Sequence, residues 1–89
     1  MEFRQLELFV CIVEQRTVSR AADVLGMSQS ALSRQVQQLE AVVGRHLLQR
    51  HGRGVEPTEA GRRLHAHAKQ LLELRAQALS DVRELSGDI

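Results

Sequence analysis

Apolar residues recur at helical spacing from the start of this 89-residue chain. In residues 3–15 they fall at i, i+3, i+4 and i+7, which predicts a helix with one apolar face. The residues on that face are Leu6, Phe9, Val10 and Val13. This face should pack across the elements that follow.

Residues 17–39 predict two short helices joined by a tight turn. Thr17 is suited to cap the first helix, and Gly26 can take the left-handed conformation that ends it. Ser28 is then the N-cap of a second helix, over about residues 29–43, because its hydroxyl can accept a free backbone N–H. Two helices around a short glycine-bearing turn are typical of a helix-turn-helix.

The second of these helices has two faces of different character. Its apolar positions repeat at i, i+4, i+7 and i+11, so this stripe should face a core. The stripe consists of Leu32, Val36, Leu39 and Val43. The opposite face, with the first turn, carries Gln29, Ser30, Ser33, Arg34 and Gln37.

This outward face has the composition of a nucleic-acid contact. A solvated helix face usually mixes glutamate with lysine, whereas residues 29–38 contain neither. Short hydrogen-bonding side chains with one arginine suit base edges and phosphates. The pattern favours a recognition helix, and it leaves open whether Arg34 contacts a base or a phosphate.

Residues 47–57 change in character and predict a β-hairpin. Two glycines bracket Arg53, as at a hairpin tip. Arg50, His51 and Arg53 place positive charge on this hairpin. A surface hairpin of any kind could look similar, but its position after a helix-turn-helix favours a wing whose arginine enters the minor groove.

The last predicted helix begins after Thr58, a suitable N-cap, and runs to about Leu85. Its apolar residues alternate steps of four and three, which resembles a heptad seam. At roughly 1.5 Å per residue the helix is about 40 Å long, too long for so small a body to cover, so we expect it to pair with a second copy. The residues expected in that dimer contact are Leu64, Ala68, Leu71, Leu72, Ala78, Leu79 and Val82.

Together these elements predict a mainly α fold. A winged helix-turn-helix of three helices and a β-hairpin would occupy residues 1–57, and a linker helix for dimerisation residues 58–89. The length and the 43% of apolar residues fit one small globular domain. The net charge is only +1, but Lys69 is the single lysine among twelve basic residues. Arginine suits bidentate contacts to phosphate and guanine, although a GC-rich genome would produce the same bias.

The sequence offers little for catalysis or for a cofactor. His65 and His67 are two apart on a helix and point about 200° apart, so they cannot share a metal. Neither His46 nor His51 has a partner at ligand spacing, and Cys11 has the surroundings of a small core residue. We therefore expect no enzyme, no metal and no cofactor. A lone cysteine, no signal peptide and no membrane-spanning run predict a cytoplasmic protein.

Three segments match one family in order and spacing: FRQLELFVCIVEQ, SRAADVLGMSQSALSRQVQQLEAVVG and LLQRHGRGVEPTEAG. Over residues 1 to about 86 the chain resembles the N-terminal DNA-binding region of LysR-type bacterial transcriptional regulators. The departures are small. Leu48 stands where phenylalanine is frequent, and Cys11 where alanine or valine is usual.

The resemblance implies binding of double-stranded promoter DNA, as a homodimer on an inverted-repeat operator. Through it, Gln29, Ser30, Ser33 and Arg34 correspond to contacts of the recognition helix, and Arg53 to the wing arginine. It also implies a following domain that senses a small-molecule effector, outside these 89 residues, and assembly of the full-length protein into tetramers in many members. No membrane partner is implied.

Two other interpretations remain at this point. One is a protein-interaction module that uses the long helix, against which the acid-free face and the wing arginines argue. The other is a different winged helix, of the MarR type or a molybdate-responsive regulator, which the long helix directly after the wing disfavours. The residues expected to bind DNA are Ser28, Gln29, Ser30, Ser33, Arg34, Gln37, Arg50 and Arg53.

Overall fold

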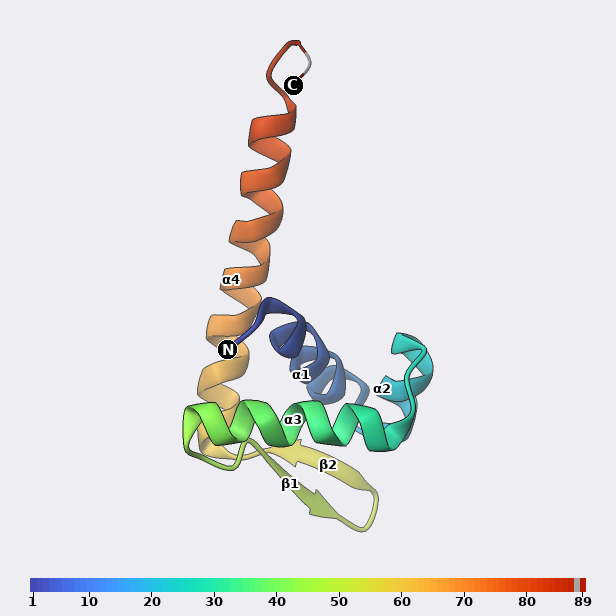
Figure 1. The fold of residues 1–89 in the computed structure, drawn as a ribbon. Helices are drawn as coiled ribbons and strands as arrows, with labels where there is room; N and C mark the ends of the chain where they lie inside the picture. Colours follow the sequence, from blue (N-terminus) through green and yellow to red (C-terminus); the bar gives the residue numbers. More distant parts are fainter. Residues whose placement is uncertain (88) are drawn as a thin grey trace.

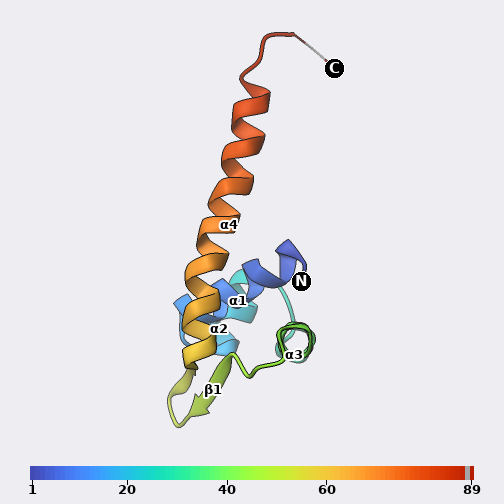
Figure 2. The ribbon, with the colours of Figure 1, turned by 90° about the vertical axis from the view of Figure 1, so that its left-hand side faces the viewer.

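The computed structural model describes residues 1–87 and 89 and consists of helices with one two-stranded hairpin. In chain order the elements are α1 (Phe3–Gln15), α2 (Val18–Leu25), α3 (Gln29–Val43), β1 (Leu48–His51), β2 (Gly54–Pro57) and α4 (Glu59–Arg83). The first three helices and the hairpin form a small body, from which α4 rises as a long rod (Figures 1 and 2). This confirms the predicted winged helix-turn-helix followed by a long helix.

The predicted caps hold the ends of the helices. The hydroxyls of Thr17, Ser28 and Thr58 each accept the backbone N–H three residues further on, at 3.0, 3.1 and 3.0 Å respectively. Gly26 ends α2 in the left-handed conformation, with φ 65°. These local signals therefore set the turn between α2 and α3 and the start of α4.

The first helix, α1, lies at the centre of the core and is buried on two sides. Leu8 and Ile12 pack into one apolar cluster with residues of α2, α3 and β2. Phe9, fully buried, packs into a second cluster with Leu39 of α3 and Leu47 beside β1. The single face expected from the sequence was therefore incomplete, because α1 is enclosed by neighbours on two sides.

The hairpin pairs β1 and β2 antiparallel, with Arg50 opposite Val55 and His51 opposite Gly54. Directly opposed residues share a face, so Arg50 lies on the face of the buried Val55 and His51 on the other. The Val55 N–H donates to the carbonyl of Arg16 at the end of α1, at 2.9 Å. A Cβ at Gly54 would collide with that carbonyl, so the hairpin requires glycine to dock so closely.

The body of the protein covers only the N-terminal part of α4. Ala68 is fully buried, and Leu64 packs against the cluster around Phe9. Ala68 therefore has no exposed surface to offer a second copy, whereas Leu64 is only half-buried, and the dimer contact expected along α4 stays a prediction. Although α4 is 25 residues long, neither it nor another helix in the described part of the chain has the length and apolar character to cross a membrane.

Charged pairs on the surface join α1 to α4. Arg75 donates to Glu7 at 3.1 Å, and its guanidinium lies 5.1 Å from the centre of the Phe3 ring. Lys69 lies 3.4 Å from Glu14. Exposed pairs of this kind contribute only about 0.2–1 kcal/mol each.

Candidate nucleic-acid interface

The outward face of α3 carries the polar side chains expected there. Ser33 is half-buried, while the others are exposed: Ser28, Gln29, Ser30, Arg34 and Gln37. The opposite stripe is buried at Leu32, Val36 and Leu39. Val43 was expected as its fourth member, but it is 37% exposed, because it lies in the last turn of α3, beyond the core.

The N-terminus of α3 is favourable for an anion. Ser28 accepts the N–H of Ala31, and its hydroxyl lies 3.4 Å from that of Ser30. No acidic residue occupies the first turn. The free N–H groups and the helix dipole therefore present positive potential there. The first turn itself offers no carboxylate that would compete with a phosphate for these N–H groups.

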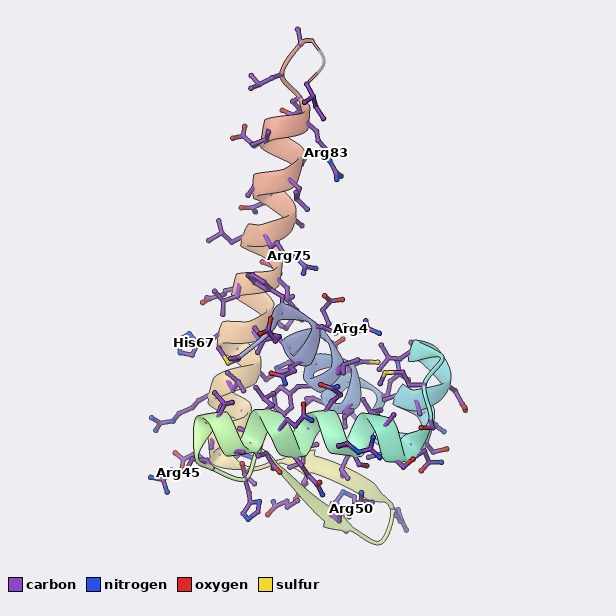
Figure 3. The ribbon with its side chains drawn as sticks, in the orientation of Figure 1. Arg4, Arg45, Arg50, His67, Arg75 and Arg83 are labelled. Carbon is purple, nitrogen blue, oxygen red and sulfur yellow. The ribbon has the colours of Figure 1, made fainter. Side chains whose placement is uncertain are left out.

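A hollow of about 140 Å³ separates α3 from the wing and joins residues of both. Ser33 and Gln37 of α3 and Arg50 of β1 line it, and Ile12 and Val55 contribute apolar surface. Figure 3 shows Arg50 on the hairpin beneath α3. The structure thus brings three of the expected residues from two elements onto one surface.

Arg53 is not part of this hollow. It lies exposed in the turn between β1 and β2, and its backbone N–H donates to Nδ1 of His51 at 3.3 Å. The wing therefore presents two separate positive groups. Arg50 lies toward α3, whereas Arg53 lies at the tip.

A hydrogen-bonded, partly buried joint behind the recognition helix was not foreseen from the sequence. Oε2 of Glu40 accepts the N–H of Leu47 at 2.7 Å and lies 3.8 Å from Nδ1 of His46. Thr58 donates its hydroxyl to the carbonyl of His46 at 2.7 Å, and its N–H to that of Leu47 at 3.0 Å. We call these residues, with Gly61, the α3–α4 joint. It fixes the end of the recognition helix, the start of the wing and the start of α4 together.

The described part of the chain shows no group of three or more His, Cys, Asp or Glu residues that could hold a metal ion. Burial, and to a lesser degree the charge of Glu14, raises the pKa of the Cys11 thiol. A thiol with a raised pKa is mostly protonated at neutral pH, which makes it a poor nucleophile. Cys11 packs against the cluster of Leu8 and Ile12, as expected for a small core residue.

Comparison with known proteins identifies the same architecture. Residues 3–62 match the model of the bacterial regulatory helix-turn-helix proteins of the lysR family. The chain is 45% identical over 86 residues to the HTH-type transcriptional regulator BudR of Raoultella terrigena, covering 97% of this chain and 30% of BudR. It is 46% identical over 93 residues to the nitrogen assimilation regulatory protein nac of Escherichia coli (strain K12), covering 100% of this chain and 30% of nac.

A solved structure agrees with these relatives. The crystal structure of a BenM_DBD/catB site 1 DNA complex matches with a TM-score of 0.93 and 39% identity, over 100% of both chains. The chain spans about 30% of the length of the curated relatives named above. The family match covers well over half of the chain, in the order of elements that the fold shows. The chain belongs to the lysR family of bacterial regulatory helix-turn-helix proteins.

Proposed function

We propose that this chain is the DNA-binding part of a transcriptional regulator and that it binds double-stranded DNA sequence-specifically. The recognition helix α3 enters the major groove, and the wing enters the adjacent minor groove. The main support for this proposal is the hollow between α3 and the wing, where Ser33 and Gln37 of α3 lie on one surface with Arg50 of β1. The similar BenM_DBD was crystallised as a DNA complex, which supports the same partner here.

The chemistry of each position suggests its role. Gln29 and Ser33 carry short neutral groups that can hydrogen-bond base edges, as residues in the first turns of recognition helices do. Ser28 and Ser30 lie at the N-terminus of α3, where phosphate is favoured. Arg34 is long enough for either a guanine or a phosphate, and Arg50 is suited to a phosphate between the two grooves.

The assembly belongs to the same proposal. Residues 1–57 bind one half-site, and the segment 58–89, which contains α4, pairs with a second copy on an inverted repeat. The relatives are about three times as long as the matched region. We also propose that, in the full-length protein, a further domain binds a small-molecule effector and mediates assembly to a tetramer. Such a regulator would work in the cytoplasm, where its DNA lies.

Alanine substitutions in α3 test whether this helix reads sequence. We expect Gln29→Ala, Ser33→Ala and Arg34→Ala each to cost about 1–3 kcal/mol on a site selected from random DNA, and to relax preference at one base pair. On random duplex each should cost less. Binding would be measured on both DNAs across a range of salt concentrations.

Matched controls lie on α4, away from the proposed interface. Gln77→Ala and Arg83→Ala remove the same groups from exposed positions and should leave both affinities unchanged. Equal losses on selected and random DNA for all three α3 variants would mean that α3 only positions the protein. No binding of wild-type protein to any duplex at micromolar concentration and low salt would favour the interaction module instead.

A second prediction concerns the tip of the wing. We expect Arg53→Ala to weaken binding mainly at sites with A/T-rich flanks, because the narrow minor groove of A/T tracts concentrates negative potential. Affinity would be measured on two duplexes that share the half-site and differ only in the flank. An equal loss on A/T and G/C flanks would reduce Arg53 to a simple phosphate contact.

A further inference from the structure

A second hollow, of about 380 Å³, lies on the β2 side of the wing, beside the end of α1. Three basic side chains line it: Arg16 from the end of α1, and His51 and Arg53 from the hairpin. Arg16 was not among the residues expected to bind DNA. The pairing of the Val55 N–H with the Arg16 carbonyl, at 2.9 Å, brings this end of α1 against the wing.

The backbone of Arg16 is in an unusual conformation. Its φ is 69°, and among residues 1–87 and 89 it is the one non-glycine residue with a positive φ. A glycine would form this left-handed helix end without strain. The backbone therefore gives no reason for an arginine here. The arginine differs from glycine by its guanidinium, which forms no ion pair within the described residues. This charged group is therefore available to a ligand.

His51 completes the set of donors. Its Nδ1 accepts the backbone N–H of Arg53, so the neutral ring carries its proton on Nε2. That N–H is the donor that the neutral ring offers to a ligand. The same hydrogen bond holds the wing tip close to His51, which keeps Arg53 near the hollow.

One carboxylate also lines the hollow. Glu56 accepts a hydrogen bond from the side-chain amide of Gln49 at 3.0 Å across the hairpin. Two guanidinium groups therefore stand against one carboxylate that already has a partner. The net charge of the site is positive, and the guanidinium fork of Arg16 with the imidazole N–H of His51 suits the several oxygens of a phosphate.

We propose that Arg16 and His51, beside Arg53 at the wing tip, form a site for one phosphate of the DNA backbone that borders the minor groove the wing enters. This inference rests on the proposed function, because it takes Arg53 to lie at that groove. Phosphates border the groove on both sides, so an arginine tip inside it would bring the hollow next to one of them. Arg16 and His51 are then DNA contacts additional to those of α3 and the wing arginines.

Arg16→Gly provides the test, because glycine relieves the strained backbone while it removes the guanidinium. We expect a thermal midpoint equal to or above that of wild type. We also expect several-fold weaker binding on both selected and random duplex, with the salt slope reduced by about one. Arg16→Lys should keep most of the slope. Arg83→Ala, which removes the same charge at the end of α4 far from the wing, should change nothing (Figure 3).

Ethylation of the DNA phosphates locates the contact. One ethylated phosphate next to the wing should impair wild-type binding and have no effect on Arg16→Gly. If Arg16→Gly binds with the wild-type affinity and salt slope while Arg34→Ala still loses affinity, the phosphate site is wrong and the proposed function stands. If inorganic phosphate shifts the wing-tip amide signals of wild type but not of Arg16→Gly, and DNA affinity is unaffected, the hollow is a site for free anions and the proposal is overturned.

Discussion

Replacement of Leu71 and Leu74 by glutamate should convert the protein to a monomer and weaken its binding to a two-half-site operator by about 100-fold or more. Leu74 is 62% exposed, and Leu71 is at the edge of the covered part of α4. Further toward the C-terminus, Leu79, Val82 and Leu85 are also exposed apolar side chains. No other segment among residues 1–87 and 89 covers this surface, and a second copy of α4 would bury it.

The readouts are sedimentation and binding to duplexes with one or two half-sites. Binding to one half-site should change little, because the DNA-contacting surface is intact. A double variant with Gln70→Glu and Gln77→Glu provides the control, since both glutamines are exposed on α4 and it adds the same charge. If the leucine variant still sediments as a dimer with unchanged affinity, this part of α4 is not the interface.

The fold could be predicted where the signal is local. Each N-cap hydroxyl acts on a backbone group three residues away, so Thr17, Ser28 and Thr58 set helix starts without help from the rest of the chain. The stripe of α3 also follows from helical period alone, and it is buried at Leu32, Val36 and Leu39. The prediction failed at the fourth position, Val43, because burial depends on where the core ends, and the helical period does not give that boundary.

The predictions that failed depended on neighbours that the sequence does not name. The period of α1 indicated one apolar face, but the fold encloses this helix on two sides, so Leu8 and Ile12 are buried as well. The same missing information included the fully buried Ala68 in the expected dimer contact, since the face of α4 that meets the body looks, in sequence, like the face that could meet a partner. The residues left for a partner are those above the body.

In the candidate site, too, the residue types could be predicted from the sequence, but their arrangement could not. The sequence grouped Arg50, His51 and Arg53 as one positive wing, yet the hairpin register places Arg50 on the α3 side and His51 on the opposite face. Side chains alternate along a strand, so a known register would have separated them. A known strand register would not have indicated the roles of Arg16 and Glu40. Their roles depend on contacts across the fold, with β2 and with the loop after α3.

Gly61→Ala should lower the free energy of unfolding by about 2–3 kcal/mol, which reverses the usual effect of alanine in a helix. Gly61 is buried in the first turn of α4, and a Cβ there would collide with the carbonyl oxygen of Leu47. That carbonyl accepts the Thr58 N–H at 3.0 Å, and the Leu47 N–H donates to Glu40. The methyl group would therefore force apart the hydrogen bonds of the α3–α4 joint.

The measurement is the urea midpoint at a fixed protein concentration, since pairing with a second copy would add to the apparent stability. Gly52→Ala provides the matched control. Gly52 lies in the wing turn, and a Cβ there would meet nothing within 4 Å. The control should leave the midpoint nearly unchanged, whereas Gly61→Ala lowers it. A midpoint for Gly61→Ala at or above wild type would mean that α4 can shift away from Leu47, and that the joint does not fix the angle between α4 and the recognition helix.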